Sequence, residues 1–386
     1  MGFSLFGLAR LGLLVAWVGQ DVAVGLLLRG SLCKTFETRT EIAVKPVETQ
    51  RKLNYGDGVC LLGSCFSDNI NARLSQAQWA PLACNPSHGI LYNASALKKA
   101  VTRSLARENY AEADLSLNPQ TGLWCSLAHH SRFSHADKQQ CLDGLNTALS
   151  KGKESLHRAR VVFVTLGTAW VYEHVASGDL AGNCHKLPQM QFKRRLQGVS
   201  EVSAALYDLT AALYAAGVEQ VVLTVSPVRH LKDGPIDSSR SRAHLLAAVH
   251  ALLDAPPPPP TMNGVIGGTS STLKPMCSYF PSLELVLDDL RDYRYYARDM
   301  LHPSDLAVDY IWGKLLQARF STAAQETMSR VERVVAAAAH RPFNPTSEPH
   351  QKFVRSQLNI AAELENSVPA LDLSRVKRVL ESALVV

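Results

Sequence analysis

The sequence lacks the cysteine spacing that zinc and redox motifs require. None of its eight cysteines forms a Cys-x-x-Cys pair, which excludes a zinc ribbon and a thioredoxin-like motif. Cysteines scattered through 386 residues favour reduced, mostly buried thiols, although one or two disulfides are also compatible with this pattern. His129 and His130 are adjacent, and no tight carboxylate–histidine spacing accompanies them. We therefore expect no metal site and no cofactor.

The chain also has little excess charge and no long basic run. Lys and Arg total 40 against 34 Asp and Glu, a net charge of +6. No basic run is interleaved with aromatic residues, so nucleic-acid binding is disfavoured. The mild positive charge is still compatible with an anionic substrate. The glycine-rich segment 267–272 has no lysine, which excludes a phosphate-binding loop of the usual kind.

Long hydrophobic runs are missing after the N-terminus. Residues 1–34 form an apolar extension interrupted by Gln20 and Asp21. A charge near the bilayer centre would cost about 3 kcal/mol, so this extension is a poor single span. It fits a secretory or organellar targeting segment, a loose extension or a start site placed too early. We expect a soluble body, with membrane contact only through 1–34, and a cytoplasmic location if that segment is not a targeting signal.

What the sequence does contain is an alternation of strand and helix patterns. The segments 58–63, 160–167 and 220–225 read as buried strands. The segments 137–156 and 242–255, and a helix capped by Ser200 and ended by Gly217, have helical spacing. This order predicts an α/β fold, a three-layer sandwich with a mostly parallel sheet and C-terminal helices. We expect one domain over 35–320, with a Pro/Gly-rich insertion at about 256–276, and a helical extension over 321–386.

The first predicted strand ends in Gly-Ser-Cys, directly before a helix over 66–76. Ser64 therefore lies at the carboxyl edge of the sheet, where ligands bind in α/β folds. A nucleophilic serine needs a base within hydrogen-bond reach, and the helix N-terminus can stabilise an oxyanion. Alternatively, Ser64 only caps that helix. Cys65 beside it is expected to be a small buried residue, although a cysteine nucleophile stays open.

A late Asp-x-x-His-Pro segment supplies the partner for such a nucleophile. Asp299 and His302 are three residues apart, so in a turn or helix they share a face. The carboxylate can then orient the imidazole while the second ring nitrogen faces outward. Pro303 favours an extended His302 ahead of a helix that starts near Ser304.

Six sequence blocks, in order along residues 36–316, carry a resemblance to a known family. They are "LLGSCFSDNI" (61–70), "NPSHGILYN" (85–93), "TLGTAWVYE" (165–173), "GNCHKLP" (182–188), "TVSPVRHLKDG" (224–234) and "YFPSLELVLDDLRDYRYYARDMLHPS" (279–304). Through them the chain resembles the GSCFA family, within the SGNH (GDSL-like) hydrolase superfamily. Ser67 stands where the family motif has Ala.

The resemblance implies a flavodoxin-like sandwich and a set of site residues. Ser64 corresponds to the nucleophile, His302 to the base and Asp299 to the orienting acid. Gly89 corresponds to the glycine that donates its N–H to the oxyanion, together with the N–H of Ser64, and Gly167 lies at a second strand end.

One position departs from the superfamily pattern. Ala169 stands where the superfamily has the asparagine of the oxyanion hole, and loss of such a donor costs about 3 kcal/mol. Asn183 and His185 are candidate substitutes, although Asn183 also fits an ordinary turn residue. Arg229 and His230 are expected at the same edge, where Arg229 can bind a carboxylate or phosphate.

These residues together predict an esterase or acyl hydrolase with a Ser-His-Asp triad. Its partner would be a small-molecule or carbohydrate ester, and the resemblance favours an O-acylated sugar. The alternatives are a catalytically inactive glycan- or ligand-binding module, which Ala169 favours, and a cysteine enzyme that uses Cys65. The sequence leaves the oligomeric state open.

Overall fold

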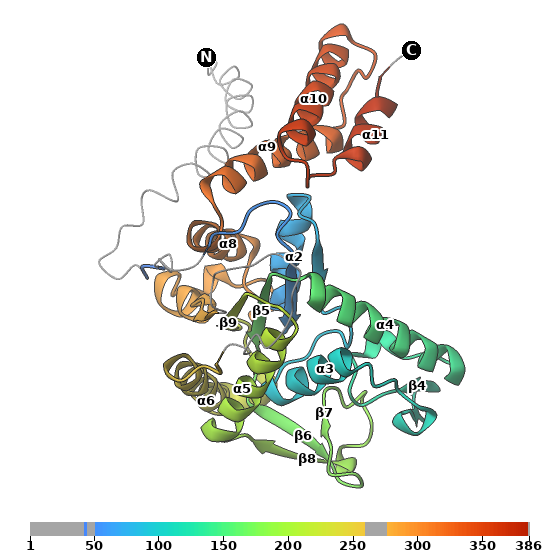
Figure 1. Cartoon of the computed structure of the whole chain (residues 1–386), viewed down its shortest axis with the longest axis vertical. Helices are drawn as coiled ribbons and strands as arrows, with labels where there is room; N and C mark the ends of the chain where they lie inside the picture. The colour runs from blue at the N-terminus through green and yellow to red at the C-terminus, as the bar shows by residue number, and fades with distance from the viewer. Residues whose placement is uncertain (1–41, 45–50, 259–275, 385–386) are drawn as a thin grey trace, which may run out of the picture.

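The structure, a computed structural model, describes residues 42–44, 51–258 and 276–384 (Figure 1). The predicted N-terminal extension (1–34) lies outside these residues. So does most of the predicted insertion at 256–276, of which only 256–258 and 276 are described.

A five-stranded parallel sheet forms the centre of the molecule, in the order β10-β9-β5-β1-β2. Its strands are β1 (Val59–Gly63), β2 (Leu82–Cys84), β5 (Val161–Leu166), β9 (Gln220–Val225) and β10 (Met276–Tyr279). The three long strands β1, β5 and β9 are buried along their whole length, so they appear in the sequence as continuous apolar runs. The predicted α/β class is confirmed, and the short strands β2 and β10 were not predicted.

The strand order reverses beside β1. The chain passes from β1 through the first helix to β2 on one side, and β5 then pairs with the other side of β1. In open α/β sheets, ligands bind outside the carboxyl ends of the strands at such a reversal. Gly63 pairs with Thr165 at this point, so the Gly-Ser-Cys segment lies at the switch point of the sheet.

Helices cover both faces of the sheet. The helices of the described residues are α2 (Phe66–Gln76), α3 (Ala94–Ala106), α4 (Lys138–Arg158), α5 (Val199–Ala215), α6 (Gly234–Asp254), α7 (Ser282–Glu284), α8 (Asp305–Arg319), α9 (Thr322–Ala339), α10 (Glu348–Ser367) and α11 (Ser374–Ser382), of which the last three pack around a core of their own. On one face α3, α5 and α6 bury Leu97, Leu206 and Leu245. On the other face α2 and α8 bury Ile70 and Ile311. The three layers follow from these two cores.

Local capping explains where several helices begin. The Asn93 side chain accepts from the N–H of Ala96 at the start of α3. Helix α8 begins directly after Ser304, as predicted, and the Ser304 side chain caps it. The prediction that Ser200 caps α5 is wrong, because the helix already begins after Gly198, whose N–H donates to the carboxylate of Glu201. Helix α6 begins eight residues before its predicted start. Its first turns consist mostly of polar residues, so the hydrophobic pattern of the sequence did not indicate them.

Two small antiparallel sheets extend the molecule beyond the central sheet. They contain β3 (Ser116–Asn118) with β4 (Leu123–Cys125), and β6 (Trp170–His174) between β7 (Leu180–Ala181) and β8 (Phe192–Leu196). The sheet of β6, β7 and β8 lies at the opposite end of the molecule from α9, α10 and α11 (Figure 1). Neither sheet was predicted, because its strands are short and, unlike β1, β5 and β9, are not buried along their whole length.

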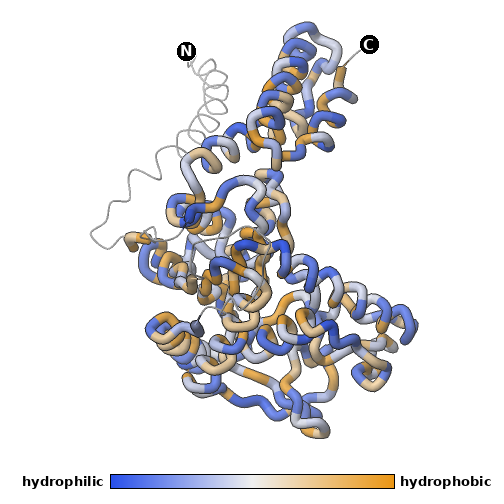
Figure 2. Tube along the Cα trace, viewed as in Figure 1, coloured by the Kyte–Doolittle hydropathy of each residue, from blue (hydrophilic) through white to orange (hydrophobic). Residues whose placement is uncertain are grey.

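The C-terminal helices α9, α10 and α11 have a hydrophobic core of their own, with Val334, Val354 and Leu373 buried in it. Hydrophobic and hydrophilic residues alternate along these helices (Figure 2), as is typical of amphipathic helices that pack on one face. Between α8 and α9, Phe320 pairs with Leu53 just before β1. The helical extension is thereby attached near the amino ends of the strands.

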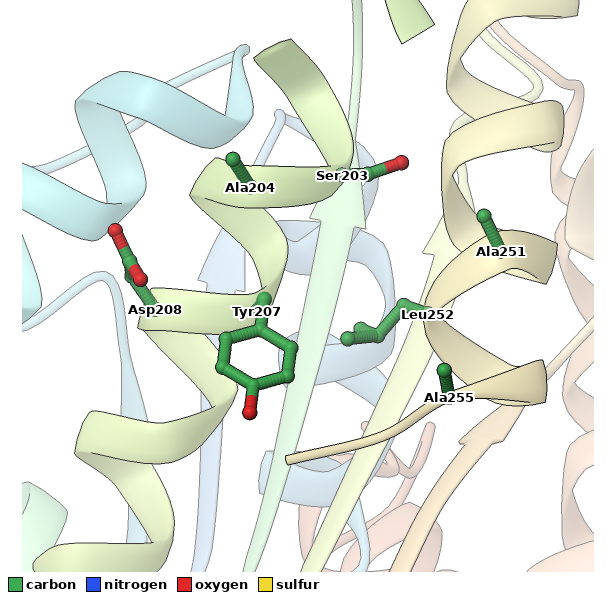
Figure 3. Close-up of a pocket in the computed structure, with 7 residues that line it drawn as sticks. All are labelled: Ser203, Ala204, Tyr207, Asp208, Ala251, Leu252 and Ala255. Carbon is green, nitrogen blue, oxygen red and sulfur yellow. The ribbon is translucent and has the colours of Figure 1, made fainter. Parts of the chain in front are cut away.

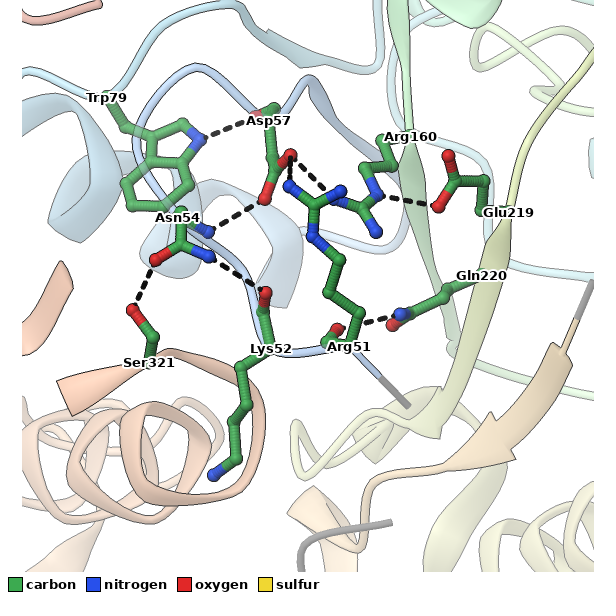
Figure 4. A network of polar contacts seen from close by, with 9 residues as sticks. All are labelled: Arg51, Lys52, Asn54, Asp57, Trp79, Arg160, Glu219, Gln220 and Ser321. Carbon is green, nitrogen blue, oxygen red and sulfur yellow. Dashed lines mark hydrogen bonds and ion pairs between the residues drawn. The ribbon is translucent and has the colours of Figure 1, made fainter. Parts of the chain in front are cut away.

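A polar network occupies that amino edge of the sheet (Figure 4). Asp57, Arg160 and Glu219 precede β1, β5 and β9, and Arg160 donates to both carboxylates at 2.7 Å. The backbone carbonyl of Asp57 also accepts from the indole of Trp79 at 3.0 Å.

Of the helices in the described residues, none has both the length and the apolar character needed to cross a membrane.

Candidate active site at the carboxyl edge of the sheet

The turn after β1 depends on Gly63. Its φ is +120°, and a Cβ at this position would lie 2.1 Å from the carbonyl oxygen of Thr165 on β5. A side chain is therefore excluded both by the backbone conformation and by the neighbouring strand. The N–H of Gly63 donates to Oδ1 of Asn85 at 2.8 Å. This turn fixes the direction in which the next two side chains leave the strand.

Ser64 lies inside the turn, with 1% of the residue exposed. Its N–H continues the sheet by donating to the carbonyl of Thr165 at 3.0 Å, and its hydroxyl accepts from the N–H of Phe66 at 3.4 Å. Gly167 lies beside it, since a Cβ at Gly167 would be 3.4 Å from the Ser64 Cβ. In the described part of the chain, Ser64 forms no hydrogen bond to His302. Its N–H, which we expected to face an oxyanion, is already used in the sheet.

Cys65 contacts the histidine instead. Its Sγ lies 3.7 Å from Nε2 of His302, and it immediately precedes the first turn of α2. Burial, followed by the charge of Asp68, raises the pKa of this thiol, while the backbone N–H groups of Cys65 and Phe66 act in the opposite direction. The thiol is therefore protonated in the free protein at neutral pH and needs a base before it can attack.

Asp299 and His302 form the expected pair. Oδ2 of Asp299 lies 2.6 Å from Nδ1 of His302, and Oδ1 accepts from the N–H groups of Leu301 and His302. The hydrogen bond to His302, followed by those two backbone N–H groups, lowers the pKa of Asp299 to about 2. The two side chains are each 45% exposed, so the pair is open to solvent on one side.

A short hairpin holds this pair in place. The N–H of Ala297 donates to the carbonyl of His302 at 2.7 Å, and that of Ser304 donates to Tyr295 at 2.8 Å. The N–H of Arg229, in the loop after β9, donates to the carbonyl of Leu301 at 3.0 Å. The loop after β9 and the hairpin are thus joined beside His302.

The model of the GSCFA family matches residues 58–315, well over half of the chain. The chain belongs to the GSCFA family. A second model, the C-terminal domain of GSCFA domain proteins, matches residues 331–386. A search of the curated proteins finds no match.

In this GSCFA protein, the sequence blocks at 61–70, 224–234 and 279–304 meet at one edge of the sheet. Tyr92, from a fourth block, joins them, because its carbonyl accepts from the N–H groups of Gly167 and Thr168 at 2.8 and 3.0 Å. Its ring lies edge-on to His230, with centroids 6.0 Å apart. Burial lowers the pKa of His230, whose buried Nε2 has no hydrogen-bond partner among the described residues.

Three predicted site residues do not contact the pair. Gly89 has φ +76°, and a Cβ there would lie 2.6 Å from the Cβ of His130, so it permits a close chain approach. Asn183 accepts from the N–H of His185 at 2.8 Å, as a turn residue does. The ring of His185 lies 2.8 Å from the carbonyl of Ser126. These contacts are structural, and none of the three forms a hydrogen bond to Cys65 or His302 in the described segments.

The position of the expected oxyanion asparagine is also filled differently. Ala169 is fully buried, and its N–H donates to the hydroxyl of Ser241 on α6 at 2.8 Å. The same hydroxyl lies 3.1 Å from Oγ1 of Thr168. Sequence reasoning did not identify Ser241, the neighbouring Arg242 or Tyr92. Tyr92 stands within one of the matching blocks, whereas the two α6 residues carry no motif.

An open groove lies elsewhere, between α5 and α6 (Figure 3). Ser203 and Tyr207 line one side, and Ala251 and Leu252 line the other. None of the site residues described above contributes to it. Among the described residues, no three His, Cys, Asp or Glu side chains gather where a metal ion could be held.

Proposed function

We propose that this protein hydrolyses or transfers ester-linked acyl groups at the Asp299–His302 pair. One observation carries the proposal: His302 has Asp299 on one ring nitrogen at 2.6 Å and the Cys65 thiol 3.7 Å from the other. An oriented base beside a nucleophile is the arrangement that acyl transfer requires. The resemblance of the chain to the SGNH hydrolase superfamily supports the same chemistry.

The geometry favours Cys65 as the nucleophile. Sγ attacks the ester carbonyl while Nε2 of His302 takes the thiol proton. His302 then gives this proton to the leaving alcohol oxygen as the C–O bond breaks, which leaves a thioester on Cys65. Water, deprotonated by His302, attacks the thioester, and the acid is released with the proton returned to the sulfur. Asp299 stabilises the imidazolium formed in both steps.

The resemblance favours Ser64 as the nucleophile, which would require its side chain to leave the buried turn. The experiment compares Cys65→Ala and Ser64→Ala in the hydrolysis of 4-nitrophenyl butyrate. We expect Cys65→Ala to lose at least about a hundredfold in kcat/KM. Ser64→Ala should stay within about tenfold of the wild type, because it loses only one weak hydrogen bond.

The reverse result, with Ser64→Ala inactive and Cys65→Ala active, would assign the reaction to the serine. Labelling with a fluorophosphonate and with iodoacetamide provides a second readout of which side chain reacts. Circular dichroism of both variants ensures that a lost rate is not a lost fold.

A non-catalytic binding module is the second candidate. The N–H groups of Ser64 and Ala169 are both engaged, and no asparagine stands at the expected oxyanion position. If wild type and both folded variants hydrolyse the ester at the same background rate and neither probe labels Ser64 or Cys65, the binding module replaces the enzyme. An O-acylated carbohydrate, suggested only by the resemblance, is one candidate ligand for either function.

A further inference from the structure

Two arginines without a carboxylate partner lie beside the candidate site. Arg229 follows β9, and Arg242 lies on α6. Neither forms an ion pair within the residues that the structure describes. Other arginines do, for example Arg240 with Asp237, three residues before it on α6.

The protein holds both side chains in position. The guanidinium of Arg229 lies over the ring of Tyr296, 4.1 Å from its centroid, and 5.1 Å from that of Tyr293. Arg242 donates to the carbonyl of Val228 at 3.2 Å. Both contacts come from neutral groups, so they fix the cations without neutralising them.

The two positive charges also act on one another and on the site. Burial lowers the pKa of Arg242, the nearby Tyr296 opposes this, and the charge of Arg229 lowers it further. The charge of Arg242 acts in turn on His230, and so does that of His302. Asp233 is the carboxylate whose charge reaches His230, and it is bound to Arg194.

Two neighbouring, partly buried cations with no carboxylate partner among the described residues favour the binding of an anion. Two guanidinium groups of like charge in a low-dielectric site are unfavourable until an anion binds between them. Guanidinium groups match the oxygen geometry of carboxylates and phosphates and bind them with two hydrogen bonds each. In the loop that also contacts the hairpin of His302, such an anion would be part of the substrate.

We propose that the substrate is an acyl ester that carries an oxyanion, a carboxylate or a phosphate, and that Arg229 and Arg242 bind this group. The inference rests on the proposed acyl-transfer function for the place of the ester, but the anion site can be tested without it. Arg229 and Arg242 are positioning residues for the substrate and take no part in the proton transfers.

The kinetic test uses two esters with the same four-carbon acyl chain. 4-Nitrophenyl butyrate is neutral, and mono-4-nitrophenyl succinate carries a carboxylate. We expect the wild type to prefer the succinate ester at least tenfold in kcat/KM. Arg229→Gln and Arg242→Gln should each lower the preference for the succinate ester over the butyrate ester roughly 10- to 100-fold, through KM for the succinate ester.

Arg240→Gln is the matched control, because it removes the same charge from the same helix but from an exposed ion pair. Arg242→Lys should recover part of the preference, since a lysine keeps the charge without the two-pronged geometry. An equal rate loss for both esters in Arg242→Gln would mean structural damage and would overturn the inference. So would a wild type without preference.

The binding test separates this inference from the proposed reaction. Calorimetric titration with sodium phosphate and with sodium succinate at low ionic strength should detect an anion site in wild type and in Arg240→Gln. Its affinity should fall at least tenfold in Arg242→Gln. Tighter binding of phosphate or of succinate identifies the oxyanion as a phosphoryl or a carboxyl group.

Anion binding with no hydrolysis of either ester would refute the acyl hydrolase and keep the anion site. Hydrolysis that depends on Cys65, with no anion binding and no succinate preference, would refute the anion site and keep the hydrolase.

Discussion

The two edges of the parallel sheet differ in the groups that contact their arginine side chains. At the amino edge, Arg160 lies between Asp57 and Glu219 with its side chain 10% exposed. At the carboxyl edge, Arg229 and Arg242 face aromatic rings and a carbonyl but no carboxylate in the described residues. In the first arrangement one cation is balanced by two carboxylates, although the buried Nη2 of Arg160 has no hydrogen-bond partner among the described residues. This difference separates an edge that stabilises the fold from the edge at which we propose that an anion binds.

The largest expected effect comes from the amino edge. Arg160→Leu leaves the carboxylate of Asp57, whose side chain is 11% exposed, without its main partner. Breaking a buried ion pair from one side costs about 3–5 kcal/mol. We expect the free energy of unfolding in urea to fall by that amount.

Arg51→Ala is the control, because Arg51 contacts the same oxygen of Asp57 at 3.4 Å but its side chain is 54% exposed. Its loss should cost about 1 kcal/mol or less. Equal effects of the two substitutions would remove the distinction between the edges.

An intermediate effect is expected in the titration of Cys65. Burial and the charge of Asp68 both disfavour the thiolate, so its pKa lies above the ordinary value of 9.0. Alkylation of the Cys65 peptide by iodoacetamide, followed by mass spectrometry, should therefore rise with pH through a midpoint above 9.0. Asp68→Asn should move this midpoint towards neutral pH, and Asp208→Asn, on α5, should not. A wild-type midpoint below 7 would show a preformed thiolate and contradict the general-base role of His302.

The smallest expected effect is on stability at the carboxyl edge. Arg242→Gln removes one of two like charges and one hydrogen bond to Val228. We expect the free energy of unfolding to change by less than about 1 kcal/mol, because these two losses oppose each other. A destabilisation near that of Arg160→Leu would show that Arg242 has a structural partner after all.

Much of the fold could be predicted from local sequence patterns. Strand β9 and helix α2 have the predicted bounds, and β1 and β5 differ by one residue at most at each end. Continuous apolar runs and helical periodicity are local signals, so they survive folding. The sheet of β6, β7 and β8 was missed because its short strands gain their stability from one another.

The candidate site was only partly predictable for the same reason. The Asp299–His302 contact spans three residues, and its spacing in the sequence indicates it. The choice between Ser64 and Cys65 depends on the turn at Gly63, whose φ of +120° directs one side chain inward and the next towards His302. Whether Arg242 has a carboxylate partner depends on which acidic residues the fold brings close to it, and no sequence motif indicates this.

The separation of Cys65 and His302 by 237 positions has a consequence during synthesis. At about 5–20 residues per second, a ribosome needs on the order of 10 to 50 seconds to travel from one to the other. During that interval Cys65 is part of the growing chain, while His302 has not yet been synthesised. The parallel pairing of β1 with β5 also joins segments that are distant in the sequence, and such contacts form slowly. The nascent chain thus contains the proposed nucleophile 237 residues before the base that is proposed to activate it.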